Sequence, residues 1–335
     1  MGAITPLSRA SGESKVKISG MSPRRAFVAI KNRASRVAVR ARCQAVMLAL
    51  RLRRRRPRLF DCCLLFEETE LLLLRFMEYY EVVDYFVIVE SKKTFRGNDH
   101  EPIFLKNREL YGRYLDKVIY LLIDQLPPNS ETDMWISETY QRNQIAQALK
   151  GRARFGDVVI LSDADEFWSV EHLDRIRRVS KPIVFRQKLF YYFLDCQSDV
   201  TWRGTCCAPY GMMTPQMMRV YGRSDETAEM VDGGWHYSYL GGIERIRSKL
   251  ENLSDAHTII DKVGTDEQIA AKASRGTALW DDEVTYSFVE MDRDHAPRSI
   301  NSLIERFPYL AGKSASAQEP SPRAEALSPP CASGN

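Results

Sequence analysis

The sequence predicts an α/β fold in which a mostly parallel sheet carries helices on both faces. Short runs of continuous apolar residues alternate with longer segments of helical periodicity between residues 59 and 161. The apolar runs lack the polar alternation of half-exposed strands, as is typical of strands buried in a parallel sheet. Ligands of such sheets bind at the carboxyl ends of the strands, so we expect functional residues there.

The individual elements follow in order along this region. The apolar runs predict strands at residues 59–66, 82–90, 118–123 and 157–161. Helical spacing of Leu71 and Leu74 predicts a helix over 67–80, and Ile145 lies on one side of a second helix over 135–149. Strands and helices therefore alternate as crossover units require.

Composition and charge divide the 335 residues into three parts. The apolar (44%) and charged (27%) fractions are those of a globular protein, but residues 1–58 hold 16 of the 48 Lys and Arg and one of the 44 acids. We expect residues 1–58 to be a basic, disordered arm, unless translation starts at Met21 or Met47. Residues 59–312 are expected to form the single catalytic domain, and the Ala/Ser/Pro-rich residues 313–335 a disordered tail.

The apolar runs and the cysteines favour a cytoplasmic protein. No run approaches the roughly 18 residues of a membrane span, and no clean secretion signal is present, so we expect no transmembrane anchor. The seven cysteines include no C-x-x-C spacing, which predicts reduced thiols and neither a zinc site nor a disulfide framework. The basic arm is expected to allow peripheral contact with an anionic membrane.

Two aspartates separated by one residue follow the fourth predicted strand. Asp163 and Asp165 can reach one hard divalent cation and leave coordination positions open for phosphate oxygens. Asp163 with Glu166 also fits a capping box for a helix that begins near Ser169. Taken alone, the motif is compatible with both interpretations.

A second cluster, DGGWHYSYLGG, spans residues 232–242. Glycine pairs at both ends allow the backbone to approach a ligand closely, and the aromatic rings between them can stack on a base or a sugar. His236 is a candidate metal ligand or diphosphate donor. The alternative is a tight turn followed by an edge strand, with Trp235 in the core.

Several segments together carry a family resemblance. They are VIVES (87–91), TFRG (94–97), ETYQRNQI (138–145), LSDADE (161–166), GWHYSYLGG (234–242), RSK (247–249) and residues 254–257. These segments resemble glycosyltransferase family 17, in the motif order of that family. The resemblance covers residues 60 to 310 and neither end of the chain.

The resemblance implies a GT-A type, Rossmann-like enzyme that transfers N-acetylglucosamine from UDP-GlcNAc to a glycan acceptor with inversion. A divalent metal, Mn²⁺ or Mg²⁺, would neutralise the departing diphosphate. On this reading Asp163 and Asp165 bridge the metal to the diphosphate, and His236 is a third residue that binds the metal or a phosphate. No nucleic-acid partner is expected.

The resemblance also suggests residues that bind the donor. Glu90, at the end of the second predicted strand, would contact the uridine or ribose, and Trp235 would form a wall for the sugar. Arg142 and Lys249 are candidates for contacts with the diphosphate. The alternative for both cations is a solvated position on a helix.

Transfer with inversion in one displacement also needs a general base for the acceptor hydroxyl. The carboxylates available are Asp232, Glu166 and Glu244. We favour Asp232 because it adjoins the glycines of the second cluster. Glu166 comes second, since its carboxylate would be engaged in capping a helix.

Two other functions are compatible with parts of the sequence. In a phosphatase of the haloacid-dehalogenase type, Asp163 would be the nucleophile and Asp165 the general acid. Such enzymes usually carry this motif on the first strand, whereas three predicted strands precede it here. A non-enzymatic nucleic-acid binder would use the Arg-rich arm, but the acidic remainder of the chain argues against it.

Overall fold

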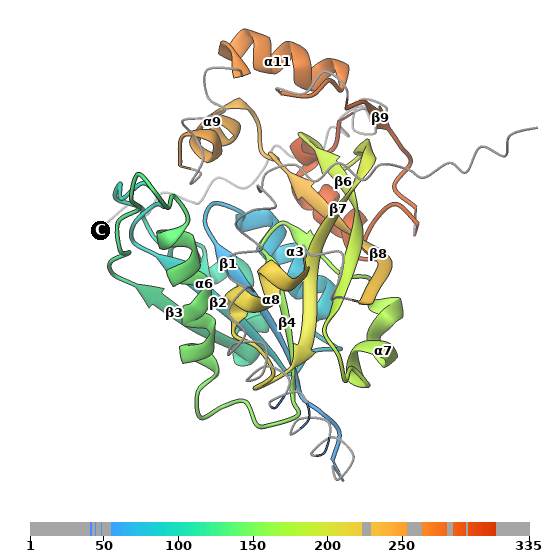
Figure 1. Cartoon of the computed structure of the whole chain (residues 1–335). Coiled ribbons are helices and arrows are strands. Elements are labelled where there is room, and N and C mark those ends of the chain that lie inside the picture. Colours follow the sequence, from blue (N-terminus) through green and yellow to red (C-terminus); the bar gives the residue numbers. More distant parts are fainter. Residues whose placement is uncertain are drawn as a thin grey trace, which may run out of the picture.

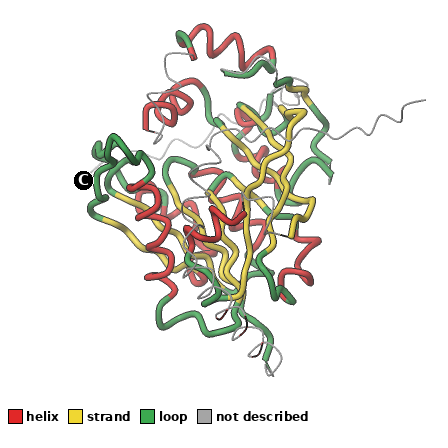
Figure 2. The backbone as a smooth tube through the Cα atoms, viewed as in Figure 1, coloured by secondary structure: helices red, strands yellow, loops and turns green. Residues whose placement is uncertain are grey.

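A computed structural model describes residues 55–222, 229–252, 263–279, 284–292 and 294–312, with the isolated residues 41, 44 and 48. The strands join in one curled sheet that runs through the centre of the molecule (Figure 2). The strands are β1 (Leu59–Leu65), β2 (Tyr85–Ser91), β3 (Val118–Ile123), β4 (Val158–Asp163), β5 (Glu166–Phe167), β6 (Ile183–Tyr191), β7 (Cys196–Pro209), β8 (Glu229–Ser238) and β9 (Tyr286–Phe288).

The first four strands form the parallel part of the sheet, in the order β3-β2-β1-β4. Their bounds agree with the four predicted strands to within three residues, because each is a continuous apolar run. β1, β2 and β4 are buried on both faces, whereas β3, at the edge of the sheet, is mostly half-buried. In β1, Leu59 and Cys63 face one core, and Phe60 and Cys62 face the other. The fold class predicted from the sequence is confirmed.

The second part of the sheet is mixed and was not predicted strand by strand. β7 runs antiparallel to both β4 and β6, while β6 and β8 are parallel. The order continues β4-β7-β6-β8-β5, so the two-residue β5 lies at the edge and β8 lies inside the sheet. The interpretation of the second sequence cluster as an edge strand is therefore wrong.

Helices cover both faces of the sheet (Figure 1). Leu71 and Phe76 of the helix after β1 pack in the first core, whereas Ile145 and Met218 pack in the second. Both predicted helices are confirmed, with ends shifted by one or two residues. The helices are α3 (Thr69–Tyr79), α4 (Ile103–Lys106), α5 (Arg108–Tyr111), α6 (Ile136–Leu149), α7 (Leu173–Arg177), α8 (Pro215–Gly222), α9 (Ile243–Asn252), α11 (Asp266–Arg275) and α12 (Ile300–Arg306), with 3₁₀ turns at 112–117, 170–172 and 308–310.

A third core lies beyond the end of the sheet, where α9 and α11 stand above the strands (Figure 1). Ile246 and Leu250 of α9 pack with Ile269 of α11 and with Tyr192 and Tyr239. Both tyrosines have positive φ angles, 66° and 58°, which are uncommon for residues with a side chain. This core fixes α9 over the carboxyl end of β1.

A buried ion pair connects α3 to the turn between β4 and β5. Arg75 and Asp61 are both fully buried, and Arg75 Nη1 lies 2.9 and 2.8 Å from the two carboxylate oxygens. Arg75 Nη2 also donates to Ser162 Oγ (2.8 Å) and to the Asp163 carbonyl (3.1 Å). Trp168 Nε1 donates to Asp61 from the other side of the turn. One guanidinium therefore holds the backbone that carries the aspartate pair.

Three further expectations concern the chain as a whole. The five described cysteines are buried and form no disulfide, as expected of reduced thiols, and burial raises the pKa of the Cys63 and Cys206 thiols to about 12. Within the described residues, no helix has both the length and the apolar character needed to cross a bilayer. The predicted arm and tail lie almost wholly outside the described residues, so the domain boundaries stay a prediction.

We expect Arg75→Met to lower the free energy of unfolding by about 3–5 kcal/mol, because Asp61 would remain buried without its partner. Urea denaturation at pH 7 measures the change. Lys92 and Asp124 provide a control, since that ion pair is exposed and Lys92→Met should change the stability little. Equal effects of the two substitutions would contradict the role given to Arg75.

Candidate active site

The candidate site lies where the strand order reverses. The chain passes from β1 to β2 and β3 on one side, and β4 then pairs with the other side of β1. Leu64 of β1 is in register with Asp163 of β4, so residues 66–68 after β1 adjoin the turn after β4. Such a reversal opens a crevice at the carboxyl ends of the two strands, which is the usual ligand site of open α/β sheets.

Asp163 faces the helices that cover the second core. Its Oδ1 lies 3.3 Å from Arg142 Nη2 of α6, and its Oδ2 pairs with Arg219 of α8. Glu138 binds the same Nη2 of Arg142 at 2.6 Å. The Asp163 side chain is 33% exposed, whereas both arginines are almost completely buried. Arg142 is therefore a buried partner of Asp163 and not a solvated helix charge.

Asp165 points to the other side of the turn, toward α9. Lys249 Nζ lies 2.6 Å from Asp165 Oδ2, and His236 Nε2 lies 3.4 Å from the same oxygen. Burial raises the pKa of Asp165, but the charges of Lys249 and His236 outweigh it and hold that pKa well below its usual range. Lys249 also lies 3.8 Å from Glu68 Oε1, so its ammonium connects the turn after β4 with the loop after β1.

Glu166 anchors the turn from inside the sheet. It is fully buried, and its carboxylate accepts hydrogen bonds from Arg219 Nη1 (2.8 and 2.9 Å), Trp202 Nε1 (2.7 Å) and the Asp163 amide (3.1 Å). Residue 166 begins β5, and the 3₁₀ turn at 170–172 is capped by Ser169 instead. The interpretation of Asp163 and Glu166 as a helix capping box is wrong.

The second sequence cluster forms β8 and the turn after it. Gly234 has φ = 101°, and a Cβ there would lie 2.1 Å from the Phe167 carbonyl, so only glycine lets β8 approach β5 so closely. His236 pairs in register with Glu166, which places its ring beside Asp165. Trp235 is buried in the first core, as the alternative interpretation of this cluster expected.

Two other predicted residues lie away from the aspartate pair. Asp232 is four residues before His236 on β8, about 13 Å along the strand, and pairs with Arg186 at the surface. Glu90 is fully buried and accepts hydrogen bonds from the amides of Ile103 and Phe104. Its carboxylate also accepts from the Tyr120 hydroxyl at 2.7 Å. Glu90 therefore holds the start of α4.

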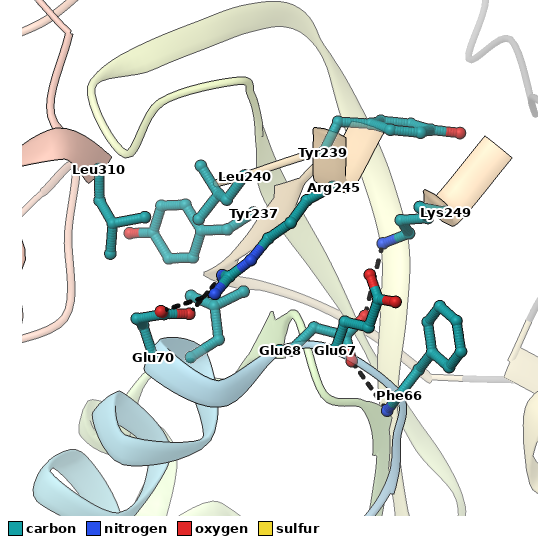
Figure 3. A pocket seen from close by; sticks show the side chains of 11 residues that line it. Phe66, Glu67, Glu68, Glu70, Tyr237, Tyr239, Leu240, Arg245, Lys249 and Leu310 are labelled. Atoms are coloured by element: carbon teal, nitrogen blue, oxygen red, sulfur yellow. Dashed lines mark hydrogen bonds and ion pairs between the residues drawn. The ribbon is translucent and has the colours of Figure 1, made fainter. Parts of the chain in front are cut away.

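A small pocket beside Lys249 contains residues that the sequence analysis missed. In Figure 3 the Lys249 ammonium points toward Glu68, and the Arg245 guanidinium binds the carboxylate of Glu70 at the start of α3. Arg245 Nη1 and Nη2 lie 2.5 and 2.9 Å from the Glu70 carboxylate, and the Tyr309 hydroxyl donates to it at 2.6 Å. Glu68 could have been found from the sequence, because it comes just after the first buried strand, where ligand-binding residues are expected. No sequence signal identifies Arg219, because only the tertiary structure brings it to Asp163.

The proposed metal ligands do not form one ligand set in this structure. Within the described ranges, no group of three or more His, Cys, Asp and Glu side chains is arranged to hold a metal ion. Asp163 faces Arg142 and Arg219, whereas Asp165 and His236 face each other beside Lys249. The two carboxylates are thus neutralised separately by cations of the chain, and the donor set does not fit a preformed three-ligand site.

We expect Arg245→Met to destabilise the protein at pH 7 and much less near pH 3. Burial by itself would raise the pKa of Glu70. Hydrogen bonds from Arg245 and Tyr309 outweigh this effect, and the pKa of Glu70 lies below its usual value. A lowered pKa contributes stability that is complete above about pH 4.3 and is lost as the pH falls toward the folded value. Urea denaturation at both pH values tests this, with the exposed Lys181→Met as control. A loss of stability independent of pH would contradict it.

Comparisons with known proteins identify the family of the chain. Residues 21–310 match the family model described as glycosyltransferase family 17. Over 109 residues, 30% of this chain, the sequence is 40% identical to the human protein named β-1,4-mannosyl-glycoprotein 4-β-N-acetylglucosaminyltransferase. The rat and mouse proteins of the same name are 40% and 39% identical over the same length. The aligned part spans about a fifth of each relative, 20% of the human protein and 19% of the rodent ones. The family match covers most of the chain, which therefore belongs to glycosyltransferase family 17.

Proposed function

We propose that the protein transfers N-acetylglucosamine from UDP-GlcNAc to a glycan acceptor. The observation that supports this most directly is the position of Asp163 and Asp165, at the end of β4 and beside the reversal of strand order. Family membership and the printed name of the three mammalian relatives support the reaction class and the sugar. Because the aligned part covers about a fifth of those relatives, the donor and the acceptor are part of the proposal.

The cations around the turn suggest how the donor would be held. Lys249, in the last turn of α9, and Arg142, in the middle of α6, lie on opposite sides of the aspartate pair. If a diphosphate bound between them, Lys249 and Arg142 would exchange their contacts with carboxylates for contacts with phosphate oxygens. The two cations would then stabilise the negative charge that grows on the diphosphate as the sugar departs. Arg219 remains bound to Glu166 and would keep the turn in place.

Divalent-metal dependence and inversion stay predictions. The expected metal, Mn²⁺ or Mg²⁺, would supply a Lewis acid for the diphosphate, but Asp163, Asp165 and His236 would first have to change partners. The general base also stays a prediction. Asp232 lies far along β8, Glu166 is buried in an ion pair, and Glu244 is exposed at the start of α9. The donor contacts predicted for Glu90 and Trp235 would require rearrangement of buried side chains.

Cytoplasmic location and peripheral contact with a membrane stay predictions as well, since most of the basic arm lies outside the described residues. A phosphatase of the haloacid-dehalogenase type has little support. The aspartate pair follows the fourth strand of the chain, and the family match is to a glycosyltransferase. The nucleic-acid interpretation rests only on the arm.

We expect the purified chain to bind UDP in the micromolar range, more tightly with Mn²⁺ than without it, and more tightly than GDP or ADP. Isothermal titration calorimetry measures each affinity. Equal UDP affinities with and without Mn²⁺ would contradict the predicted metal site and leave the transferase proposal standing. No binding of any nucleotide diphosphate by a folded chain would contradict the proposal itself.

Asp163→Asn and Asp165→Asn should each lower kcat for transfer at least about 100-fold, because each removes a carboxylate proposed to hold the metal that neutralises the donor diphosphate. Release of UDP from UDP-GlcNAc in the presence of acceptor measures the rate, and circular dichroism checks the fold. Asp99→Asn is the matched control, since Asp99 pairs with Lys93 at the surface. Turnover at the wild-type rate in both variants would rule out the assignment.

A further inference from the structure

A groove opens next to the pocket of Lys249 and leads away from the aspartate pair. It has a volume of about 750 Å³, within the range of roughly 300–1,000 Å³ that is usual for small-molecule sites. Its walls come from the start of α3, from α4 and α5, from α9 and from the end of α12. Glu67, Glu70 and Arg245 line both the groove and the smaller pocket, so the two spaces adjoin.

The charges of the groove balance one another. Three carboxylates and three cations line it: Glu67, Glu70, Glu244, Lys106, Arg245 and Arg306. The cations that face the aspartate pair, Arg142, Arg219 and Lys249, are not among its lining residues. A nucleoside diphosphate carries several negative charges and gains no net attraction from such a lining. The groove is therefore suited to an uncharged, polar ligand.

The lining groups match the hydroxyls of a sugar chain. Carboxylates such as those of Glu67 and Glu244 accept hydrogen bonds from hydroxyls, and the Asn107 amide can donate as well as accept. Ser248 Oγ donates to Glu67 Oε1 at 2.7 Å, which holds that carboxylate at the wall. The Phe307 ring adds an apolar surface on which the C–H face of a pyranose can lie.

The groove also leads to the proposed reaction centre. Arg245 and Lys249 are one helical turn apart on α9, and Glu67 and Glu68 are neighbours after β1. Lys249 contacts both Glu68 and Asp165. A ligand that extends along the groove would thus place its end beside the loop after β1, next to the crevice proposed for the donor.

We propose that this groove binds the acceptor, as a neutral oligosaccharide whose reacting end lies beside Glu67 and Lys249. The inference rests on the proposed transferase function and extends it to the acceptor. Exposed Lys106 of α4 and exposed Arg306 of α12 line the groove, and neither touches the aspartate pair in the contacts described above. Both can be changed without removing a buried charge.

The double variant Lys106→Gln/Arg306→Gln removes two exposed cations from the groove and leaves every candidate general base in place. The probe is a synthetic oligosaccharide that carries a β-1,4-linked mannose, with UDP-GlcNAc as donor. We expect KM for the oligosaccharide to rise at least about tenfold, since two polar contacts are weakened. KM for UDP-GlcNAc, and its hydrolysis without acceptor, should stay within about twofold of wild type. Lys150→Gln/Lys181→Gln is the control, because it removes the same charge, both residues are exposed and neither lines the groove.

The outcomes separate this inference from the proposed function. An acceptor KM within about twofold of wild type in the groove variant, with donor use intact, would overturn the inference and leave the transferase proposal standing. A wild-type chain that binds UDP, but neither binds nor modifies the oligosaccharide, would also overturn it. Failure of the folded wild-type chain to bind or use UDP-GlcNAc would instead contradict the proposed function, and that result appears before any variant is made.

Discussion

The buried pair of Arg75 and Asp61 is the constraint on which the candidate site depends. Both side chains are completely withdrawn from water, so each needs the other to compensate the loss of hydration. The second terminal nitrogen of Arg75, Nη2, donates to Ser162 Oγ and the Asp163 carbonyl, at the end of β4. Trp168 closes the same cluster, and its ring stacks on Tyr79 of α3 with centroids 4.5 Å apart. The turn between β4 and β5 is thereby fixed against a helix on one face of the sheet.

Once this turn is fixed, its two aspartates diverge. Asp163 reaches Arg142 and Arg219 over the second core, and Asp165 reaches Lys249 and His236 beneath α9. Both carboxylates pair with cationic side chains that come from other elements of the fold. The crevice at the carboxyl ends of β1 and β4 therefore contains balanced charges that a phosphorylated ligand could repartition.

The helix α9 connects the two halves of the proposed reaction. Its Lys249 contacts Asp165 at the proposed donor site, and its Arg245 and Ser248 line the adjoining groove. The helix is held by the third core, which includes Tyr239 with its positive φ angle, and the Lys249 ammonium lies 5.4 Å from the centre of that ring. Membership of glycosyltransferase family 17 fits an arrangement in which one polar surface holds a charged donor and its neighbour a neutral acceptor.

The sequence by itself determined the parallel part of the sheet, its crossover helices and the position of Asp163 and Asp165, because apolar runs and helical spacing are local patterns. It also pointed to Arg142, Lys249 and His236, through motifs whose order resembles a family. Only the tertiary structure decided which charges meet. Arg219 is 56 residues from Asp163 and Lys249 is 84 from Asp165, and such pairs leave no periodic signal. The strands β6 and β7 were not predicted for the same reason, since pairing between strands, not local pattern, placed β7 beside β4 and β6 between β7 and β8.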